Sequence, residues 1–460
     1  MNFKRQTSND YDRKTDDGEQ SEVLKRRLLS AWNNMKFGLI SPSTTTFSIE
    51  YPVWILGKCY NLNPDMEATL RLQPVQPNCL LPMKEFRRHF SSLFWFTYRR
   101  DFPKILDSDY TTDTGWGCMI RSAQMMFAIG LSYFLIGKDF RTTGRCHSRV
   151  QTHLYKSILR FFNDSPMEIS PFSLHKLVKL SAAFGKQPGD WFGPSLVAHV
   201  LKKALEESHN PVMNSNQGVC VYVSQDCTIY KDDVTQLCQQ CAGCSKKNCS
   251  DDNWRSLIIL VPVRLGGESF NPIYQPCVKA LLTLDSCIGI IGGRPKHSLY
   301  FVGFQEDTLI YLDPHFCQPA VDMTSEDFPF ETFHCDSPRK LPMKKMDPSC
   351  TIGFYCANKE EFENFCVKAT EMCHPPMQKT TYPIFIVAPG NCQKLTSSLD
   401  LLSSTSYTDN PNESDRFHFE CRSRTTDDMY SLQEIAGESI MLADKPAEDY
   451  VVLGSFKENE

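Results

Sequence analysis

The feature that most constrains the fold is a series of short apolar runs in the second half of the chain. They lie at 219–224, 257–263, 299–304, 308–313 and 383–388, and their branched and aromatic residues are typical of strands. Helical patterns lie before and between them, the clearest at 194–208, where Pro194 begins an apolar stripe. Helices early and strands later predict an α+β fold around an antiparallel or mixed sheet.

The ends of the chain differ in composition from this middle part. Residues 1–22 are polar and charged and are predicted to form a disordered leader, and residues 396–460, rich in Ser, Thr, Asn and Asp, a flexible tail. One domain is expected over 23–395, with insertions near 140–165 and 209–255. Its first segment has helical spacing, which predicts either a short helix packed on the body or an interfacial anchor exposed when the leader is removed.

Charge and targeting signals limit the function classes. The 460 residues include 49 basic and 54 acidic ones, a net charge of −5, which argues against nucleic acid as the main partner. Neither a signal peptide nor an apolar run long enough to span a bilayer is evident, so we expect a cytoplasmic protein. In that reducing compartment the 20 cysteines should remain mostly thiols.

One of these thiols, Cys118, follows the stretch 111-TTDTGWG-117 and precedes a long apolar helix candidate at 119–137. Asp113 and Thr114 are predicted as its caps. Cys118 would then lie in the first helical turn, where unpaired N–H groups and the helix dipole favour a thiolate. The alternative, a buried thiol in a loop, stays open on this pattern alone.

A base for such a thiol is offered by 311-YLDPHFCQ-318. Asp313 and His315 are two residues apart at the end of a strand-like run, and residues i and i+2 share a strand face. A carboxylate placed there can orient the imidazole and favour its protonated form. A capped strand end with an exposed histidine is the open alternative.

Four further thiols, Cys238, Cys241, Cys244 and Cys249, lie in the second predicted insertion with C-x₂-C-x₂-C-x₄-C spacing. Such a set can hold zinc, act as redox-sensitive thiols, or belong to a disordered cysteine-rich loop. The spacing departs from the paired C-x₂-C pattern with a long spacer. We therefore expect neither a metal nor any other cofactor.

Several longer strings resemble one known family. They are TDTGWGCMIRSAQMM, GDWFGPS at 189–195, IIGGRPKHSLYFVGF at 290–304, LIYLDPH at 309–315 and MDPSCTIGFYC at 346–356. In this order they resemble the autophagins, the cysteine proteases that process ubiquitin-like autophagy modifiers. The phrases VRLGGESFNPIYQPCVK and HSLYFVGFQEDTLIYLDPHFCQP resemble the vertebrate D-type branch most and the C-type branch second.

The resemblance implies a papain-like cysteine protease fold with a small additional subdomain. It also implies roles for four residues. Cys118 would be the nucleophile, His315 the general base and then acid, and Asp313 the group that orients it. Tyr98 would donate its hydroxyl to the oxyanion.

Further residues take expected roles from the same resemblance. Trp191 would lie over the active site, and the loop around Pro295 would be a regulatory loop that lifts. Near the C-terminus, 448-EDYVVL-453 would bind the modifier by adding to a sheet edge, with Tyr450 and Leu453 filling pockets.

The implied enzyme is a thiol hydrolase that cleaves after the modifier's C-terminal glycine. It would prime the precursor and release the modifier from phosphatidylethanolamine, a delipidation that serves autophagosome formation and protein transport. It would act as a monomer and meet membranes through the lipidated substrate. The alternative is a weakly active member that mainly binds modifiers as a regulator.

One departure concerns the leader. Where the D-type branch carries a caspase-type site, this chain has 16-DDGEQSEV-23 without Asp-Glu-Val-Asp. The departure puts in doubt activation by that cleavage, together with a mitochondrial association after N-terminal trimming.

Overall fold

The computed structural model describes residues 28, 30–35, 45–60, 83–142, 148–239, 254–294, 297–373 and 383–392. The helices are α3 (Met83–Ser91), α4 (Cys118–Leu135), α5 (Arg149–Phe161), α6 (Leu174–Ser181), α7 (Pro194–Glu206), α8 (Lys231–Gln239), α9 (Gln275–Leu282) and α10 (Lys359–Cys373). The strands are β1 (Val53–Ile55), β2 (Lys58–Tyr60), β3 (Tyr98–Arg100), β4 (Val219–Val223), β5 (Thr228–Tyr230), β6 (Ser256–Arg264), β7 (Cys287–Arg294), β8 (His297–Gln305), β9 (Thr308–Leu312), β10 (Cys317–Pro319), β11 (Arg339–Pro342), β12 (Ser349–Cys356) and β13 (Ile386–Ala388).

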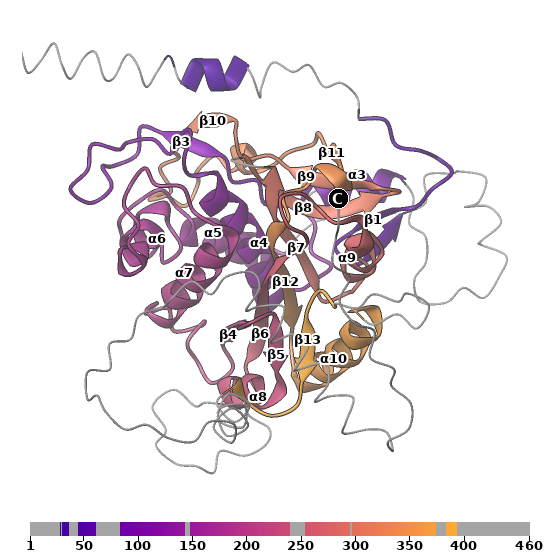
Figure 1. Cartoon of the computed structure of the whole chain (residues 1–460). Coiled ribbons are helices and arrows are strands. Elements are labelled where there is room, and N and C mark those ends of the chain that lie inside the picture. Colours follow the sequence, from indigo (N-terminus) through magenta and orange to yellow (C-terminus); the bar gives the residue numbers. More distant parts are fainter. Residues whose placement is uncertain are drawn as a thin grey trace, which may run out of the picture.

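A mixed sheet forms the centre of the molecule (Figure 1). In the described part of the chain its strand order is β11-β9-β8-β7-β12-β6-β4, and β1 with β2 extends it beside β8. The β4–β6 pair is parallel, whereas the other pairs of this sheet are antiparallel. The predicted α+β class with a mixed sheet is confirmed.

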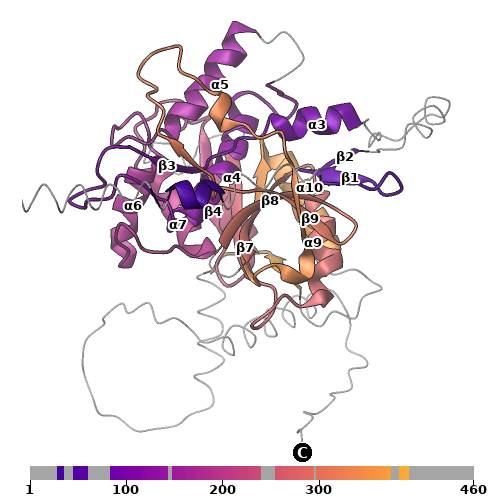
Figure 2. The ribbon, with the colours of Figure 1, turned by 90° about the horizontal axis from the view of Figure 1, so that it is seen from above.

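Helices cover both faces of this sheet, with α4 to α7 on one side and α9 and α10 on the other (Figures 1 and 2). Strand β6 explains why both faces need cover. Ile258 and Leu260 pack in the core formed with α4, α5 and α7, while the alternate residues Leu257 and Ile259 pack in the core formed with α9 and α10. A strand buried on both faces reads as the continuous apolar run that the sequence contains.

Helix α4 is the central helix of the first core. Among the described residues it is the one helix long and apolar enough to cross a membrane, which the sequence analysis did not expect. However, 83% of it is buried inside the fold. Its apolar character is therefore that of a core helix.

Two sequence predictions need adjustment. The apolar run at 383–388 forms only the short strand β13, which pairs with β5 outside the main sheet. The segment 140–165 contains α5, whose capping box at Ser148 and Gln151 starts a helix with an apolar face in the first core. That it and 209–255 are insertions stays a prediction, and the leader and the tail lie outside the described residues.

A glycine sets how closely α4 approaches the sheet. A Cβ on Gly130 would lie 2.8 Å from Cδ1 of Ile258 and 3.4 Å from Cδ1 of Ile288. We predict that Gly130→Val lowers the free energy of unfolding by about 1–3 kcal/mol, because the added methyl groups push the helix off β6 and β7. Gly267→Val is the matched control, since a Cβ there meets no atom within 4 Å. Equal effects of the two changes in denaturant unfolding would contradict this account of the packing.

Candidate active site

Cys118 is the first residue of α4 and is 1% exposed. The N-cap is Gly117, which makes no side-chain capping bond, so the prediction of Asp113 or Thr114 as caps was wrong. The carboxylate of Asp113 instead accepts hydrogen bonds from the Arg99 backbone N–H and from Nε of Arg121, both at 2.7 Å. Because no capping side chain occupies them, the N–H groups of the first turn can stabilise a negatively charged sulfur on Cys118.

A buried ion cluster supports the turn that precedes Cys118. Arg121, 1% exposed, binds Asp113 and, at 2.8 Å, Asp164. Burial opposes the charge of Arg121, but the two carboxylates outweigh it and raise the pKa of the guanidinium above its ordinary value. A charge that is buried and paired on two sides stays ionised and fixes its partners.

Asp313 and His315 lie in the turn after β9, which ends at Leu312. Oδ1 of Asp313 accepts from the backbone N–H of His315 at 3.0 Å and from its Nδ1 at 2.7 Å. The predicted pair is therefore present, but a turn brings the two groups together, not a shared strand face. Burial opposes the charge of Asp313, yet His315 and Arg339, which binds its Oδ2 at 2.9 Å, lower its pKa to about 2.

The thiol and the imidazole meet. His315 hydrogen-bonds the Cys118 sulfur, which also receives the backbone N–H of Ser298 and the hydroxyl of Tyr98. Burial alone would raise the pKa of Cys118, but these bonds and the charge of His315 lower it. Burial likewise disfavours the imidazolium, while Asp313 and Cys118 raise the pKa of His315 to about 9. The arrangement favours a thiolate–imidazolium pair.

Tyr98 is the first residue of β3, which runs parallel to β10. Its backbone N–H donates to the carbonyl of Pro314 at 2.8 Å, so the same short sheet carries Tyr98 and the turn of His315. Burial, followed by the nearby charges of Cys118 and Asp113, raises the pKa of Tyr98 well above its ordinary value. The phenol therefore remains a hydrogen-bond donor beside the sulfur.

Three residues of this site were missed by the sequence analysis: His297, Ser298 and Arg339. The first two lie in the string 290–304 that carried the resemblance, from which only Pro295 received a role. The imidazole of His297 lies flat on His315, with ring centroids 3.7 Å apart. No local pattern marks Arg339, because its contact with Asp313 spans 26 residues.

An N-terminal segment reaches the strand that follows His315. Residues 30–35 are helical, and Asn33 donates to the carbonyl of His315. The amide of Asn34 both accepts from the N–H of Cys317 at 2.7 Å and donates to its carbonyl at 2.8 Å. This part of the predicted helix therefore packs on the body.

Of the remaining predicted residues, some lie in the described part of the chain and others outside it. Trp191, in the loop before α7, is 43% exposed, so it is not an ordinary core residue. Pro295, Tyr450 and Leu453 lie outside the described residues. Of the four loop thiols, Cys238 is buried with its sulfur 3.5 Å from that of Cys220, and the other three lie outside the described residues.

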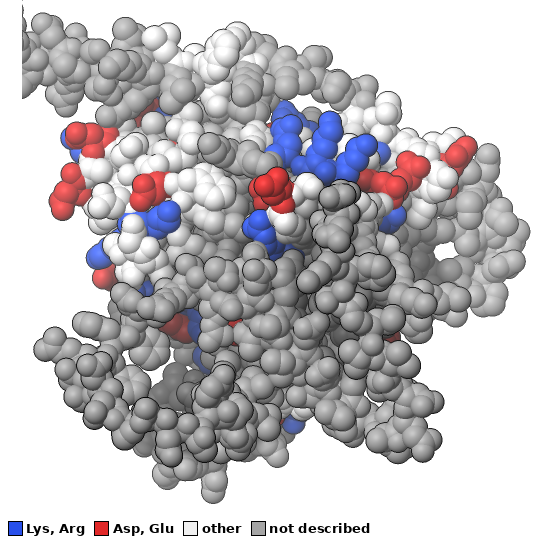
Figure 3. Space-filling view, in the orientation of Figure 1, with Lys and Arg blue, Asp and Glu red and all other residues white. Residues whose placement is uncertain are grey.

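Basic side chains gather where β11 lies (Figure 3). The residues there include Arg339 and Lys340 of β11 and Lys344 and Lys345 just after it. Arg339 is engaged with Asp313, and Lys340 hydrogen-bonds Gln305 and lies over the ring of Phe47. Of these four side chains, Arg339 thus contributes to the candidate site and Lys340 to the packing of the fold.

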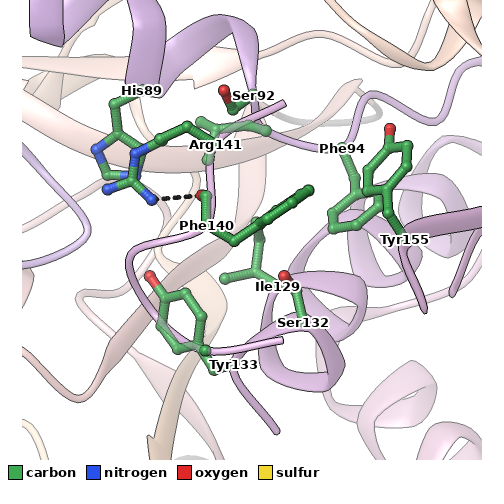
Figure 4. A pocket seen from close by; sticks show the side chains of 11 residues that line it. His89, Ser92, Phe94, Ile129, Ser132, Tyr133, Phe140, Arg141 and Tyr155 are labelled. Carbon is green, nitrogen blue, oxygen red and sulfur yellow. Dashed lines mark hydrogen bonds between the residues drawn. The ribbon is translucent and has the colours of Figure 1, made fainter. Parts of the chain in front are cut away.

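A small pocket lies between the C-terminal half of α4, α3 and α5 (Figure 4). It holds about 330 Å³ of empty space, including its open mouth, and its lining contains none of Cys118, Asp313, His315 and Tyr98. His89 in its wall accepts or donates a 2.7 Å bond with Tyr60, and burial together with the charge of Arg141 holds its pKa well below the usual value. The pocket is separate from the candidate active site.

A buried thiol at a helix start, paired with a histidine–aspartate turn on a mixed sheet, is typical of a papain-like cysteine protease. The sequence model of the peptidase C54 catalytic domain matches residues 83–368, more than half of the chain. The chain therefore belongs to the peptidase C54 family, the autophagins, and is a cysteine protease. The expected family and fold are confirmed.

Curated relatives agree with this assignment. "Cysteine protease ATG4D" of Xenopus laevis is 42% identical over 419 residues, covering 82% of this chain and 84% of that protein. "Cysteine protease ATG4C" of Homo sapiens is 37% identical over 481 residues, covering 92% and 98%. Both expected branches are thus represented.

The pKa shifts predict an unusual pH profile for the reactivity of Cys118. Its lowered pKa keeps the thiolate to lower pH than an ordinary thiol, and the imidazolium of His315 persists up to its pKa of about 9. Because Cys118 is 1% exposed, iodoacetamide reaches it only when the site opens locally, and we expect the rate of alkylation to fall as the pH is lowered through the depressed pKa of Cys118. His315→Ala should move that midpoint upward.

Peptide mass mapping assigns the alkylated thiol in this experiment. Cys287 is the internal control, because burial raises its pKa to about 12 and the native protein should leave it unmodified. An unchanged midpoint in the His315→Ala protein would show that His315 does not stabilise the thiolate.

Proposed function

We propose that this protease hydrolyses the bond after the C-terminal glycine of ubiquitin-like autophagy modifiers, in the precursor and in the phosphatidylethanolamine conjugate. Cys118 is the nucleophile, His315 the base and acid, Asp313 its orienting group and Tyr98 the oxyanion donor. The observation that carries the proposal is the hydrogen-bonded Cys118–His315 pair at the start of α4. The family membership and the names of the relatives support the substrate class.

The first half-reaction forms an acyl-enzyme. The Cys118 thiolate attacks the glycine carbonyl, and the carbonyl oxygen gains negative charge beside the hydroxyl of Tyr98, whose raised pKa keeps it protonated. As the carbon–nitrogen bond breaks, the imidazolium of His315 gives its proton to the leaving amine. Asp313 keeps Nδ1 of His315 occupied, so the other ring nitrogen serves this transfer.

The second half-reaction is the same for both substrates. Water attacks the thioester carbonyl, His315 takes a proton from it, and the glycine carboxylate is released. The precursor and the lipid conjugate differ only in the amine that leaves first, a peptide amine or the amine of ethanolamine. One site can therefore serve priming and delipidation, without the enzyme itself entering the membrane.

Access to this site is restricted, which agrees with glycine, the residue without a side chain, before the cut. Cys118 is 1% and His315 4% exposed, so substrate must displace some cover. We propose that Trp191 and the loop of Pro295 form this cover and that the tail motif of Tyr450 and Leu453 captures the modifier. The protein is proposed to act as a cytoplasmic monomer.

The same burial favours a second candidate function, a regulator that binds modifiers and cleaves them slowly. Turnover of precursor and of lipid-conjugated modifier, measured beside binding affinity, separates the two functions. A chain lacking residues 1–22 tests whether the leader limits the rate. Tight binding with negligible turnover by both chains would favour the regulator.

The nucleophile assignment predicts the behaviour of Cys118→Ala. Without the sulfur no acyl-enzyme forms, so cleavage of both substrates should fall to background while modifier binding remains. Cleavage followed by gel and mass spectrometry, with affinity from calorimetry, measures both. Cys59→Ala, a half-buried thiol in β2, is the control expected to keep activity. Continued cleavage by Cys118→Ala would refute the assignment.

The role of Tyr98 predicts a second loss. Tyr98→Phe removes only the hydroxyl, and because an oxyanion donor acts in the transition state, kcat should fall about 10²-fold with little change in KM. Tyr230→Phe removes a hydroxyl from a buried tyrosine of β5 and should keep kcat. A Tyr98→Phe enzyme with wild-type kcat would exclude this donor.

A further inference from the structure

His297 lies directly on the ring of the candidate general base. The imidazoles of His297 and His315 are parallel within 2°, with centroids 3.7 Å apart. Tyr98 meets His315 edge-on at 5.4 Å, and Asp313 holds its Nδ1 at 2.7 Å. The ring of His315 is thus contacted by a stacked ring, by a nearly perpendicular ring and at one nitrogen.

These groups do not have the geometry of a metal centre, although ligand atoms of His297, Asp313 and His315 lie within 4.8 Å of one another. Imidazole lone pairs lie in the ring plane, and those of two stacked parallel rings cannot both point at one ion about 2 Å away. Asp313 is already shared between His315 and Arg339. The arrangement is a ring stack within a hydrogen-bonded site.

The stack on His297 restricts a tilt of the His315 ring that the hydrogen bond to Asp313 permits. The hydrogen bond from Nδ1 to Asp313 sets where the ring is held but permits it to tilt about that bond. A flat neighbour at van der Waals distance restricts the tilt and keeps the remaining ring nitrogen aimed at Cys118. Small misplacements of a proton donor are costly, since about 1 Å can reduce a rate about 10²-fold.

His297 itself is held by the sheet. It is the first residue of β8 and is paired with Arg294 of β7. A Cβ on Gly293, whose φ is +142°, would lie 2.1 Å from the carbonyl oxygen of His297, so only glycine permits this close hairpin. A stack anchored on a strand is a rigid support for a side chain in a turn.

We propose that His297 is a positioning residue whose stacked imidazole holds the plane of the His315 ring, so that His315 stays aimed at the Cys118 sulfur. The proposal rests on the proposed catalytic roles of Cys118 and His315. It gives His297 no contact with substrate and no proton transfer of its own.

The test compares a variant that keeps a flat ring with one that does not. His297→Phe retains the stack, and His297→Leu loses it at similar volume. We expect His297→Leu to lower kcat for precursor cleavage about tenfold with KM within twofold, and to raise the pH midpoint for alkylation of Cys118 by iodoacetamide. His297→Phe should keep kcat within about threefold and the midpoint unchanged. His209→Leu, at an exposed histidine, should change neither.

Each other outcome overturns the inference. Wild-type kcat in His297→Leu would show that the stack is dispensable, and equal losses in the Leu and Phe variants would assign the effect to the imidazole nitrogens. A raised KM with unchanged kcat would place His297 against the substrate. If His297→Leu fails to fold by circular dichroism, His297→Gln replaces it as the variant without a ring.

Failure of the proposed function would look different. Alkylation reports the Cys118 thiolate without any substrate. If Cys118→Ala still cleaves precursor, the catalytic assignment fails, whereas the alkylation midpoints of the His297 variants still decide whether His297 positions His315.

Discussion

The buried charge of Arg121 is the interaction on which the geometry of the site depends. Its partner Asp113 also accepts the backbone N–H of Arg99, the neighbour of Tyr98, at 2.7 Å. A Cβ on Gly117 would lie 2.4 Å from Oδ2 of the same carboxylate. One carboxylate therefore joins the turn before Cys118 to the strand of Tyr98. Removing Arg121 would leave two carboxylates buried without their cation, a typical cost of about 3–5 kcal/mol.

Burial serves the chemistry of the site and also restricts access to it. Excluding water strengthens the attraction between the Cys118 sulfur and the His315 imidazolium, because the local dielectric constant is low. The same exclusion leaves Cys118 only 1% exposed. An opening that admits a substrate also admits water, which weakens the ion pair until the substrate itself fills the site.

The sequence predicted the features that depend on local pattern. Apolar patterns located α4, α7 and the strands β4, β6, β8 and β9, whereas β7 and β12, in the middle of the sheet, were not among the predicted strands. The helix dipole argument placed Cys118 at a helix start. Contacts between distant residues escaped it. Asp113 was predicted as a cap, because a sequence does not reveal that Arg121, which is also paired with Asp164, binds its carboxylate. Asp313 and His315 were paired correctly through the wrong geometry, and Tyr98 was identified only by resemblance, since its setting is that of any buried aromatic.

The missed residues His297 and Ser298 explain how a nucleophile on a helix and a base in a turn keep a fixed position relative to each other. They are adjacent on β8, yet one acts through its side chain, on the ring of His315, and the other through its backbone N–H, on the Cys118 sulfur. The hydroxyl of Ser298 also donates to Ser122 of α4 at 3.0 Å. Two consecutive residues of the central sheet thus contact both catalytic candidates. The dipeptide His297–Ser298 therefore helps to set the distance between Cys118 and His315. As part of a strand in the central sheet, it is a stiffer link than the loops that precede these two residues.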